Sequence, residues 1–200
     1  MSPDARVAPW SAGLALLFWA GLPSAVQAHD FTAALLVLGE DRELRLAEAV
    51  RGFLLAADER DGHDAETSDG HLGGVDVHVL PLPRAAAGLV EGLSGAPDDP
   101  PDIVVVIASA PDADTAGEVD PDASLVISPG VLPAGWEADT TAEGFAARYR
   151  KAFGTVPGEA AALGYHAARR LDAAIRPLDG VSRRGALAAE LRATESRFDW

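Results

Sequence analysis

The side chains best suited to bind a metal ion gather in one polar stretch, residues 61–71. Its two histidines, His63 and His71, alternate with aspartates in the order Asp-Gly-His-Asp…Asp-Gly-His. Imidazole and carboxylate groups together suit a divalent ion such as zinc. The spacing matches no tight ligand motif, so the favoured interpretation is a solvated polar loop. A metal-binding or metal-delivery function for residues 61–71 is the alternative.

His29 is a third candidate metal ligand, because of where the chain is expected to be cut. Residues 11–20 form an uncharged apolar run, Pro23 follows, and small residues stand at Val26 and Ala28. This pattern predicts a secretory signal peptide over residues 1–28 with cleavage after Ala28. The new N-terminal amine and the ring of His29 could then chelate copper. The apolar run is too short for a membrane-spanning helix, so no membrane insertion is expected after cleavage.

Catalytic signatures are few in this sequence. It contains no cysteine, which excludes thiol nucleophiles, thiolate metal sites and disulfides. It also lacks the G-x-S-x-G, H-E-x-x-H and phosphate-binding glycine patterns. We therefore expect a protein that is not an enzyme and that needs no cofactor.

Polar and small residues follow three apolar runs at the points where each run ends. These residues are Gly39-Glu40, Ser109-Ala110 and Ser128-Pro129-Gly130. In an open α/β sheet, ligands bind beyond the carboxyl ends of the strands. Ser109, Ala110, Ser128, Pro129 and Gly130 are therefore candidate ligand-binding residues, with Trp136 as an apolar wall. The alternative is that the serines start turns and that Trp136 packs on the core.

The elements that must position these residues alternate between strands and helices. Short apolar runs predict strands at 31–38, 75–80, 103–108 and 125–128, the second of them ended by Pro81 and Pro83. Periodic patterns predict helices at 43–60, 84–93, 141–153, 159–175 and 182–193. Residues 61–74 are predicted to be a loop. Asp41, Thr140 or Thr141, and Ser182 are the expected helix caps, and Gly154 is an expected helix stop.

This order predicts an α/β fold, a three-layer αβα arrangement around an open, mostly parallel sheet. The segments around Leu36, Val77, Val105 and Val126 should lie side by side, so that their carboxyl ends share one rim. Residues 29–200 are long enough for one domain with its own core. The formal net charge of −15 makes nucleic-acid binding and adhesion to anionic lipid unfavourable.

Two stretches resemble type I periplasmic solute-binding proteins, the branched-chain amino-acid receptors of ABC importers. In residues 46–79, Arg51-Gly52-Phe53-Leu54-Leu55-Ala56-Ala57-Asp58-Glu59 precedes a polar loop and Gly73-Gly74-Val75-Asp76-Val77. In residues 145–175, Phe145, Tyr149, Phe153-Gly154, Pro157, Gly164-Tyr165-His166-Ala167, Leu171 and Ala174-Ile175 follow a second phrase of that family. The family usually has an acidic residue at the position of His166, which we interpret as a packing residue or a surface contact with no role in chemistry. We interpret His78, within a strand, as half-buried and structural.

The resemblance implies a reduced form of the type I periplasmic-binding-protein fold. It also implies a periplasmic location, an ABC permease as partner and an amino-acid-like organic solute held at Ser109 and Ser128. Family members are longer and close two lobes on their ligand, whereas this chain has room for about one. The leading hypothesis is a solute-binding-protein-like domain for small-molecule uptake or sensing. A further alternative to metal binding is an accessory protein of a periplasmic enzyme system with no ligand of its own.

Overall fold

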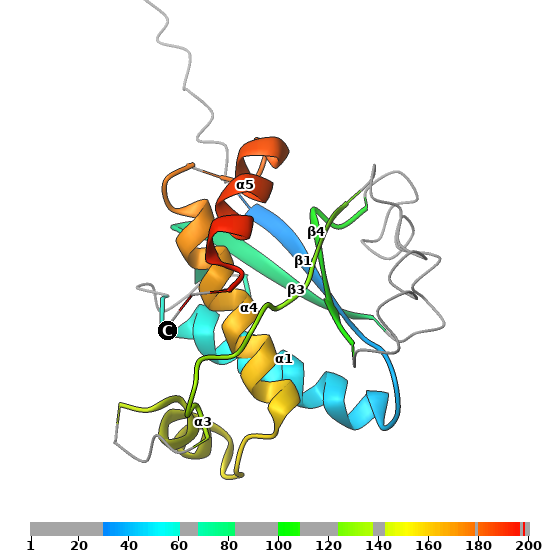
Figure 1. Ribbon diagram of the computed structural model, residues 1–200, viewed down its shortest axis with the longest axis vertical. Helices are drawn as coiled ribbons and strands as arrows, with labels where there is room; N and C mark the ends of the chain where they lie inside the picture. Colours follow the sequence, from blue (N-terminus) through cyan, green and yellow to red (C-terminus); the bar gives the residue numbers. More distant parts are fainter. Residues whose placement is uncertain are drawn as a thin grey trace, which may run out of the picture.

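The computed structural model describes residues 30–60, 68–82, 100–108, 124–137, 143–178, 180–196 and 198. Within these ranges a five-stranded sheet is packed against helices on one face (Figure 1). The strands are β1 (Asp30–Val37), β2 (His71–Leu72), β3 (Val75–Leu82), β4 (Ile103–Ile107) and β5 (Leu125–Ile127). The helices are α1 (Arg42–Asp58), α3 (Phe145–Phe153), α4 (Glu159–Ile175) and α5 (Arg184–Thr194).

The strand order is β2-β3-β1-β4-β5, and every neighbouring pair is parallel except β2 with β3. The predicted arrangement of four parallel segments in one sheet is therefore confirmed. β1 lies in the middle, where Leu35 pairs with Pro81 of β3 and with Val105 of β4. Its continuous apolar run fits this position, because a central parallel strand is buried on both faces.

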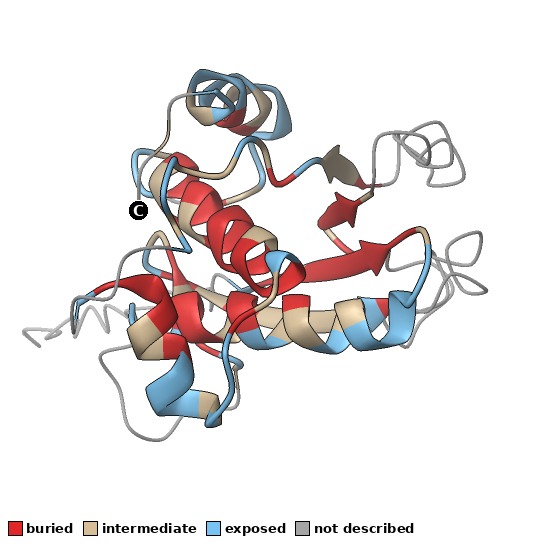
Figure 2. Cartoon of the chain, turned by 60° about the horizontal axis from the view of Figure 1, so that its bottom comes forward, coloured by how far each residue is buried: buried red, intermediate tan, exposed pale blue. Residues whose placement is uncertain are grey.

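The described helices all contribute to one apolar core on a single face of the sheet. Buried residues run through α4 and along the side of α1 that faces the sheet (Figure 2). The opposite face carries a second buried cluster that includes Leu36, Val104 and Val106. The helix predicted at 84–93, which would form a third layer there, lies outside the described residues. The fold is thus α/β with a mostly parallel sheet.

Helices α1 and α4 approach each other unusually closely at two glycines. A Cβ atom on Gly52 would overlap the carbonyl oxygen of Ala161, and one on Gly164 would overlap that of Ala49. Only a residue without a side chain allows the two backbones to meet at this distance. Gly52 lies in the stretch 46–79 and Gly164 in the stretch 145–175, so these two distant parts of the sequence pack directly on each other.

The predicted loop at 61–74 is wrong at its end, because His71 and Leu72 form β2. Gly73 and Gly74, with φ of 66° and 85°, make the two-residue turn of a β-hairpin between β2 and β3. The buried carboxylate of Asp172 in α4 accepts the Gly73 N–H at 2.8 Å. This contact with a distant helix holds the hairpin in place. In the local sequence, the glycine pair is the only sign that a hairpin turn forms here.

The predicted end of the second strand is also wrong, because β3 continues through Pro81 to Leu82. The N–H groups of Val77 and Val79 point to the outer edge, where they meet the Gly70 carbonyl and the Asp69 carboxylate. Pro81 follows in the same alternation. Its missing N–H therefore removes no bond to β1, which is the position where a strand tolerates proline.

Two of the expected helix caps do not form. Asp41 adopts a left-handed conformation, with φ of 48°, and makes no side-chain cap to α1 within the described residues. The cap position of α5 is Arg183, not Ser182, since the helix starts at Arg184. Thr140 and Thr141 lie outside the described residues, and α3 begins at Phe145. The stop at Gly154 is confirmed by its φ of 73°.

Over the described ranges, no helix combines the length and the apolar character that crossing a bilayer requires.

We expect Gly164→Ala to lower the free energy of unfolding by about 1–3 kcal/mol, because the new methyl group separates α4 from α1. Gly185→Ala in α5 is the matched control: among the described residues nothing lies within 4 Å of its added Cβ. The control should be neutral or stabilising by up to ~1 kcal/mol. Urea denaturation followed by circular dichroism measures both. Equal stabilities of the two variants would contradict the close helix contact.

Candidate functional site

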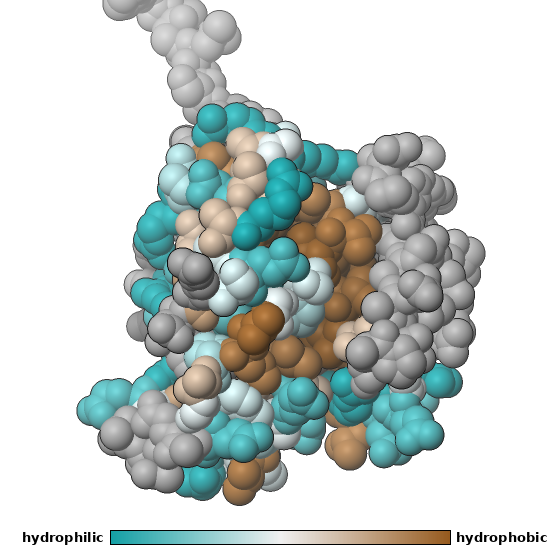
Figure 3. Space-filling model, in the orientation of Figure 1, coloured by the Kyte–Doolittle hydropathy of each residue, from teal (hydrophilic) through white to brown (hydrophobic). Residues whose placement is uncertain are grey.

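A pocket of about 420 Å³ opens where strands β4 and β5 end. Figure 3 shows this region as an apolar hollow beside the helices. It lies at the carboxyl ends of parallel strands, where open α/β sheets bind their ligands. Its walls come from the end of β4, from β5 and the segment after it, from α4 and from the end of α5. The lining residues are Val106, Ile107, Ala108, Val126, Ile127, Ser128, Pro129, Gly130, Val131, Leu163 and Glu195.

The described lining is apolar apart from two side chains, the Ser128 hydroxyl and the Glu195 carboxylate. Val106 and Val126 supply apolar wall from the sheet, and Leu163 supplies it from α4. A few polar groups among apolar walls are typical of small-molecule sites. Glu195 is the one charged member of this described lining, so its carboxylate is the group there that can pair with a cationic part of a ligand.

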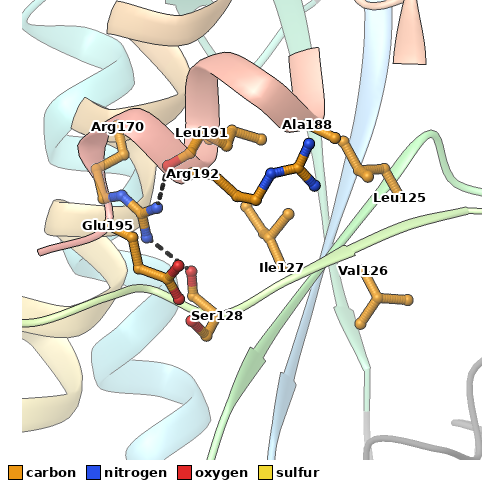
Figure 4. Close-up of a pocket in the computed structure, with 9 residues that line it drawn as sticks. All are labelled: Leu125, Val126, Ile127, Ser128, Arg170, Ala188, Leu191, Arg192 and Glu195. Atoms are coloured by element: carbon orange, nitrogen blue, oxygen red, sulfur yellow. Dashed lines mark hydrogen bonds between the residues drawn. The ribbon is translucent and has the colours of Figure 1, made fainter. Parts of the chain in front are cut away.

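The loop that carries Ser128 is held in place by the guanidinium of Arg170 (Figure 4). Arg170 donates to the Ser128 carbonyl at 2.9 Å, to the Leu191 carbonyl at 2.7 Å and to the Thr194 hydroxyl at 3.1 Å. One side chain from α4 thus joins the exit of β5 to the last turn of α5. The Val131 N–H adds a bond of 3.2 Å to the Glu195 carbonyl.

Gly130 is required where the loop passes this arginine. Its φ is 87°, a conformation that favours glycine, and a Cβ there would lie 2.6 Å from an Nη1 atom of Arg170. The loop therefore approaches the guanidinium through a residue without a side chain. Glycine at this position serves both the turn and the close approach.

Arg170 is only 3% exposed. Burial lowers the pKa of its guanidinium, while the negative charge of Glu195 acts in the opposite direction. An arginine stays protonated in proteins, so a full positive charge lies behind the pocket wall. The three acceptors it bonds are neutral. Glu195 therefore lines the pocket and also interacts electrostatically with Arg170.

A smaller hollow of about 190 Å³ lies on the α5 side of β5, and Figure 4 shows its residues. It shares Val126, Ile127, Ser128 and Glu195 with the main pocket. Ala188 and Arg192 of α5 complete its wall. At less than half the volume of the main pocket, this hollow offers less room for a small molecule.

Another hollow, of about 390 Å³, lies at the start of α1. Its described lining is one run of four residues, Asp41 to Leu44, of which Leu44 is 65% exposed. One short segment does not surround a ligand.

The strand order reverses between β1 and β4, so the main pocket lies one strand away from that reversal.

The predicted ligand-binding residues divide into three groups. Ser128, Pro129 and Gly130 line the main pocket. Ser109 and Ala110 lie outside the described residues. Trp136 lies beyond the pocket, half-buried against the core with its ring centroid 6.2 Å from that of Phe145.

Of the three candidate metal-binding histidines, the structure describes only His71. His29 and His63 lie outside the described residues, and so do Asp61 and Asp64. His71 Nε2 lies 2.6 Å from a carboxylate oxygen of Asp76, its partner across the β2–β3 pair. Among the described residues, no group of three or more histidine, aspartate or glutamate side chains is placed to hold an ion.

The two remaining histidines, His78 and His166, contact residues of the fold and do not line the pocket. His78 lies in β3 with its Nε2 3.7 Å from a carboxylate oxygen of Asp30, and its side chain is 41% exposed. His166 is fully buried in α4, where its ring centroid lies 5.7 Å from that of Phe198.

Sequence reasoning missed Arg170, Glu195 and Leu163. The available signal was the position of Arg170 inside the buried stripe of α4, next to Ala167 and Leu171, where an arginine is out of place unless its charge has partners. The sequence around Glu195 contains no such signal, because the position of this residue depends on how the end of α5 packs.

A second polar cluster joins α1, α3 and α4. The Arg148 guanidinium donates to Glu59 at 2.6 Å and to the Tyr165 hydroxyl at 2.6 Å, and that hydroxyl donates to Glu59 at 2.7 Å. Burial, together with the neighbouring Glu59, raises the pKa of Tyr165 to about 12. These bonds tie the end of α1 to α3 and α4, so the cluster stabilises the helix packing.

The raised pKa of Tyr165 gives a stability that depends on alkaline pH. The folded protein holds the phenolic proton up to about pH 12, whereas the unfolded chain releases it near 10. The contribution is therefore complete below pH 10 and is lost as the pH rises from 10 to 12. We expect the urea midpoint to fall across this range, and to fall less in Tyr165→Phe. Absorbance of tyrosinate should still be short of full amplitude in the folded protein at pH 12 and should become complete on unfolding; full titration of the folded protein by pH 10.5 would contradict it.

We expect Arg170→Leu to lower the free energy of unfolding by at least about 2 kcal/mol, since interior carbonyls left without a donor cost ~1–3 kcal/mol each. Arg170→Lys keeps the charge but not the three-way geometry, so it should recover only part of the loss. Arg192→Leu, an exposed arginine of the same small hollow, is the control and should change stability by less than about 0.5 kcal/mol. Thermal denaturation measures all three. If Arg170→Leu were as stable as the control, Arg170 would not be what holds the Ser128 loop against α5.

Comparison of the chain with protein-family models, with curated proteins and with solved structures finds no match.

Proposed function

We propose that this chain binds a small, mainly apolar solute that carries an amino group, in the pocket at the ends of β4 and β5. The observation that carries the proposal is the lining: apolar side chains with one hydroxyl, Ser128, and one carboxylate, Glu195. The apolar body of the solute would contact Val106, Val126 and Leu163. Its amino group would face Glu195.

The size of the pocket supports a small ligand. At about 420 Å³ it falls near the lower end of the range for small-molecule sites, roughly 300–1,000 Å³. A solute of the size of leucine or a branched amine fills a space of this order. The net charge of −15 also favours the approach of a cation over that of an anion.

The biological setting follows from the resemblance to solute receptors. In this proposal the domain acts in the periplasm after loss of residues 1–28, and it serves uptake or sensing together with an ABC permease. It performs no chemistry on the solute. With one lobe it cannot enclose its ligand by hinge closure, so we expect a dissociation constant weaker than those of two-lobed receptors.

Three related compounds test the ligand chemistry: leucine, 3-methylbutylamine and 3-methylbutanoate. They share one branched apolar body and differ in their amino and carboxyl groups. We expect leucine and the amine to raise the melting temperature in a thermal-shift assay and to bind in calorimetry, and the acid to do neither. Equal binding of the amine and the acid would contradict the role of Glu195.

Two variants locate the binding. Leu163→Trp fills the pocket and should abolish the thermal shift. Glu195→Gln should weaken binding of the amine about three- to tenfold, the effect of one partly exposed charged hydrogen bond. Glu190→Gln, also on α5 but away from the pocket, is the control. Unchanged binding in Leu163→Trp would place the ligand elsewhere.

A further inference from the structure

A second surface of the molecule exposes apolar side chains around Trp136. Val131 and Val156 are 66% and 70% exposed, and they come from segments on the two sides of Trp136. We call this the Trp136 surface; its described members are Val131, Leu132, Pro133, Trp136, Glu137, Val156, Pro157 and Glu159. Exposed apolar residues that gather in one place, unlike single ones, mark interaction sites.

The surface is hollowed on both sides of the indole. One hollow, of about 460 Å³, lies between residues 130–137 and the start of α4. The other, of about 290 Å³, lies between Trp136 and the α3–α4 connection with Val156. Trp136, Glu137 and Glu159 line both hollows. A partner could thus contact the indole and both carboxylates together.

The indole is held in position before any partner arrives. Its ring centroid lies 6.2 Å from that of Phe145, which in turn packs at 5.7 Å on Tyr149 and at 4.7 Å on Tyr165. The backbone N–H of Trp136 bonds the Pro133 carbonyl at 3.4 Å. A large aromatic side chain that is already ordered loses little entropy on binding, which is why tryptophan dominates many interfaces.

The charges of this surface select the kind of partner. Glu137 and Glu159 lie beside the indole, and Arg150 lines only the smaller hollow. A cation next to a tryptophan ring and two carboxylates gains both ion pairing and cation–π attraction. A second copy of this chain would bring the same two carboxylates and a net charge of −15 against them, so self-association is disfavoured.

We propose that the Trp136 surface docks a segment of a partner protein that presents arginine or lysine between apolar side chains. The apolar side chains would cover Val131 and Val156, and the basic group would lie over Trp136 between Glu137 and Glu159. Val131 lines both this surface and the solute pocket, but the groups that would recognise the basic side chain, Trp136, Glu137 and Glu159, lie outside the pocket.

A pair of matched peptides tests it: acetyl-Leu-Arg-Val-Arg-Leu-amide and its twin with glutamate in place of arginine. Binding is followed by the NMR signal of the Trp136 indole N–H, assigned from its loss in Trp136→Phe. We expect the arginine peptide to shift this signal saturably at low salt, with a dissociation constant at least tenfold below that of its twin. Glu137→Gln combined with Glu159→Gln should weaken binding at least fivefold, and Lys151→Gln on α3 should not.

Several outcomes would overturn the proposal. These are equal effects of the two peptides, no saturable shift from either, or binding unchanged in the double glutamine variant. Tetramethylammonium that bound as tightly as the arginine peptide would make the surface a small-cation site instead. A dimer in analytical ultracentrifugation, lost in Trp136→Phe, would assign the surface to a second copy of the chain.

Discussion

The contact between α1 and α4 determines where nearly every other feature of this protein lies. Gly52 and Gly164 allow the two helix backbones to touch, and this fixes α4 against the sheet. α4 then supplies Leu163 to the pocket and Arg170 to the β5 exit, and it supplies Asp172 to the β2–β3 hairpin. Interiors are close-packed and do not deform continuously, so a shift of α4 would disturb all three at once.

Arg170 shows how a buried charge can organise a site without an ion pair at hydrogen-bond distance. Its bonds reach two carbonyls and a hydroxyl, which are neutral groups from β5 and α5. The carbonyl of Leu191 lies in the last turn of α5, where a cation is favoured by the helix dipole. The guanidinium spreads its N–H donors over three nitrogen atoms and so reaches three separated acceptors, whereas a lysine donates from a single nitrogen atom. The same guanidinium requires glycine at position 130, so the arginine and the shape of the Ser128 loop depend on each other.

Much of the fold could be predicted from apolar runs and helical periodicity. β1, β4 and α4 occupy nearly the predicted residues, because each has a strong pattern that agrees with its burial. The errors come from contacts with distant residues and from local backbone conformation, neither of which the apolar pattern shows. The hairpin that contains β2 depends on the bond from Gly73 to Asp172. Pro81 is tolerated within β3 because the side of the strand where its N–H is missing faces away from β1. Asp41 looks like a helix cap in the sequence, but its left-handed backbone removes it from that role.

The candidate site was predictable only where it follows from the order of the strands. That order places Ser128, Pro129 and Gly130 at the rim, and the pocket is found beside them. Leu163 and Glu195 come from helices 30 or more residues later, and no local pattern indicates which side of those helices meets the rim.

The pocket and the Trp136 surface lie on two sides of the same short stretch of chain. Gly130, Val131 and Leu163 line both the pocket and the larger hollow beside Trp136. A solute in the pocket and a protein segment on the surface would therefore contact a common wall. Any coupling between the two would act through these residues, and by thermodynamic linkage it would change both binding constants by the same factor. The Val131 N–H bonds the main-chain carbonyl of Glu195, the residue whose carboxylate we propose as the partner of the solute, and this bond would give such coupling a direct structural route.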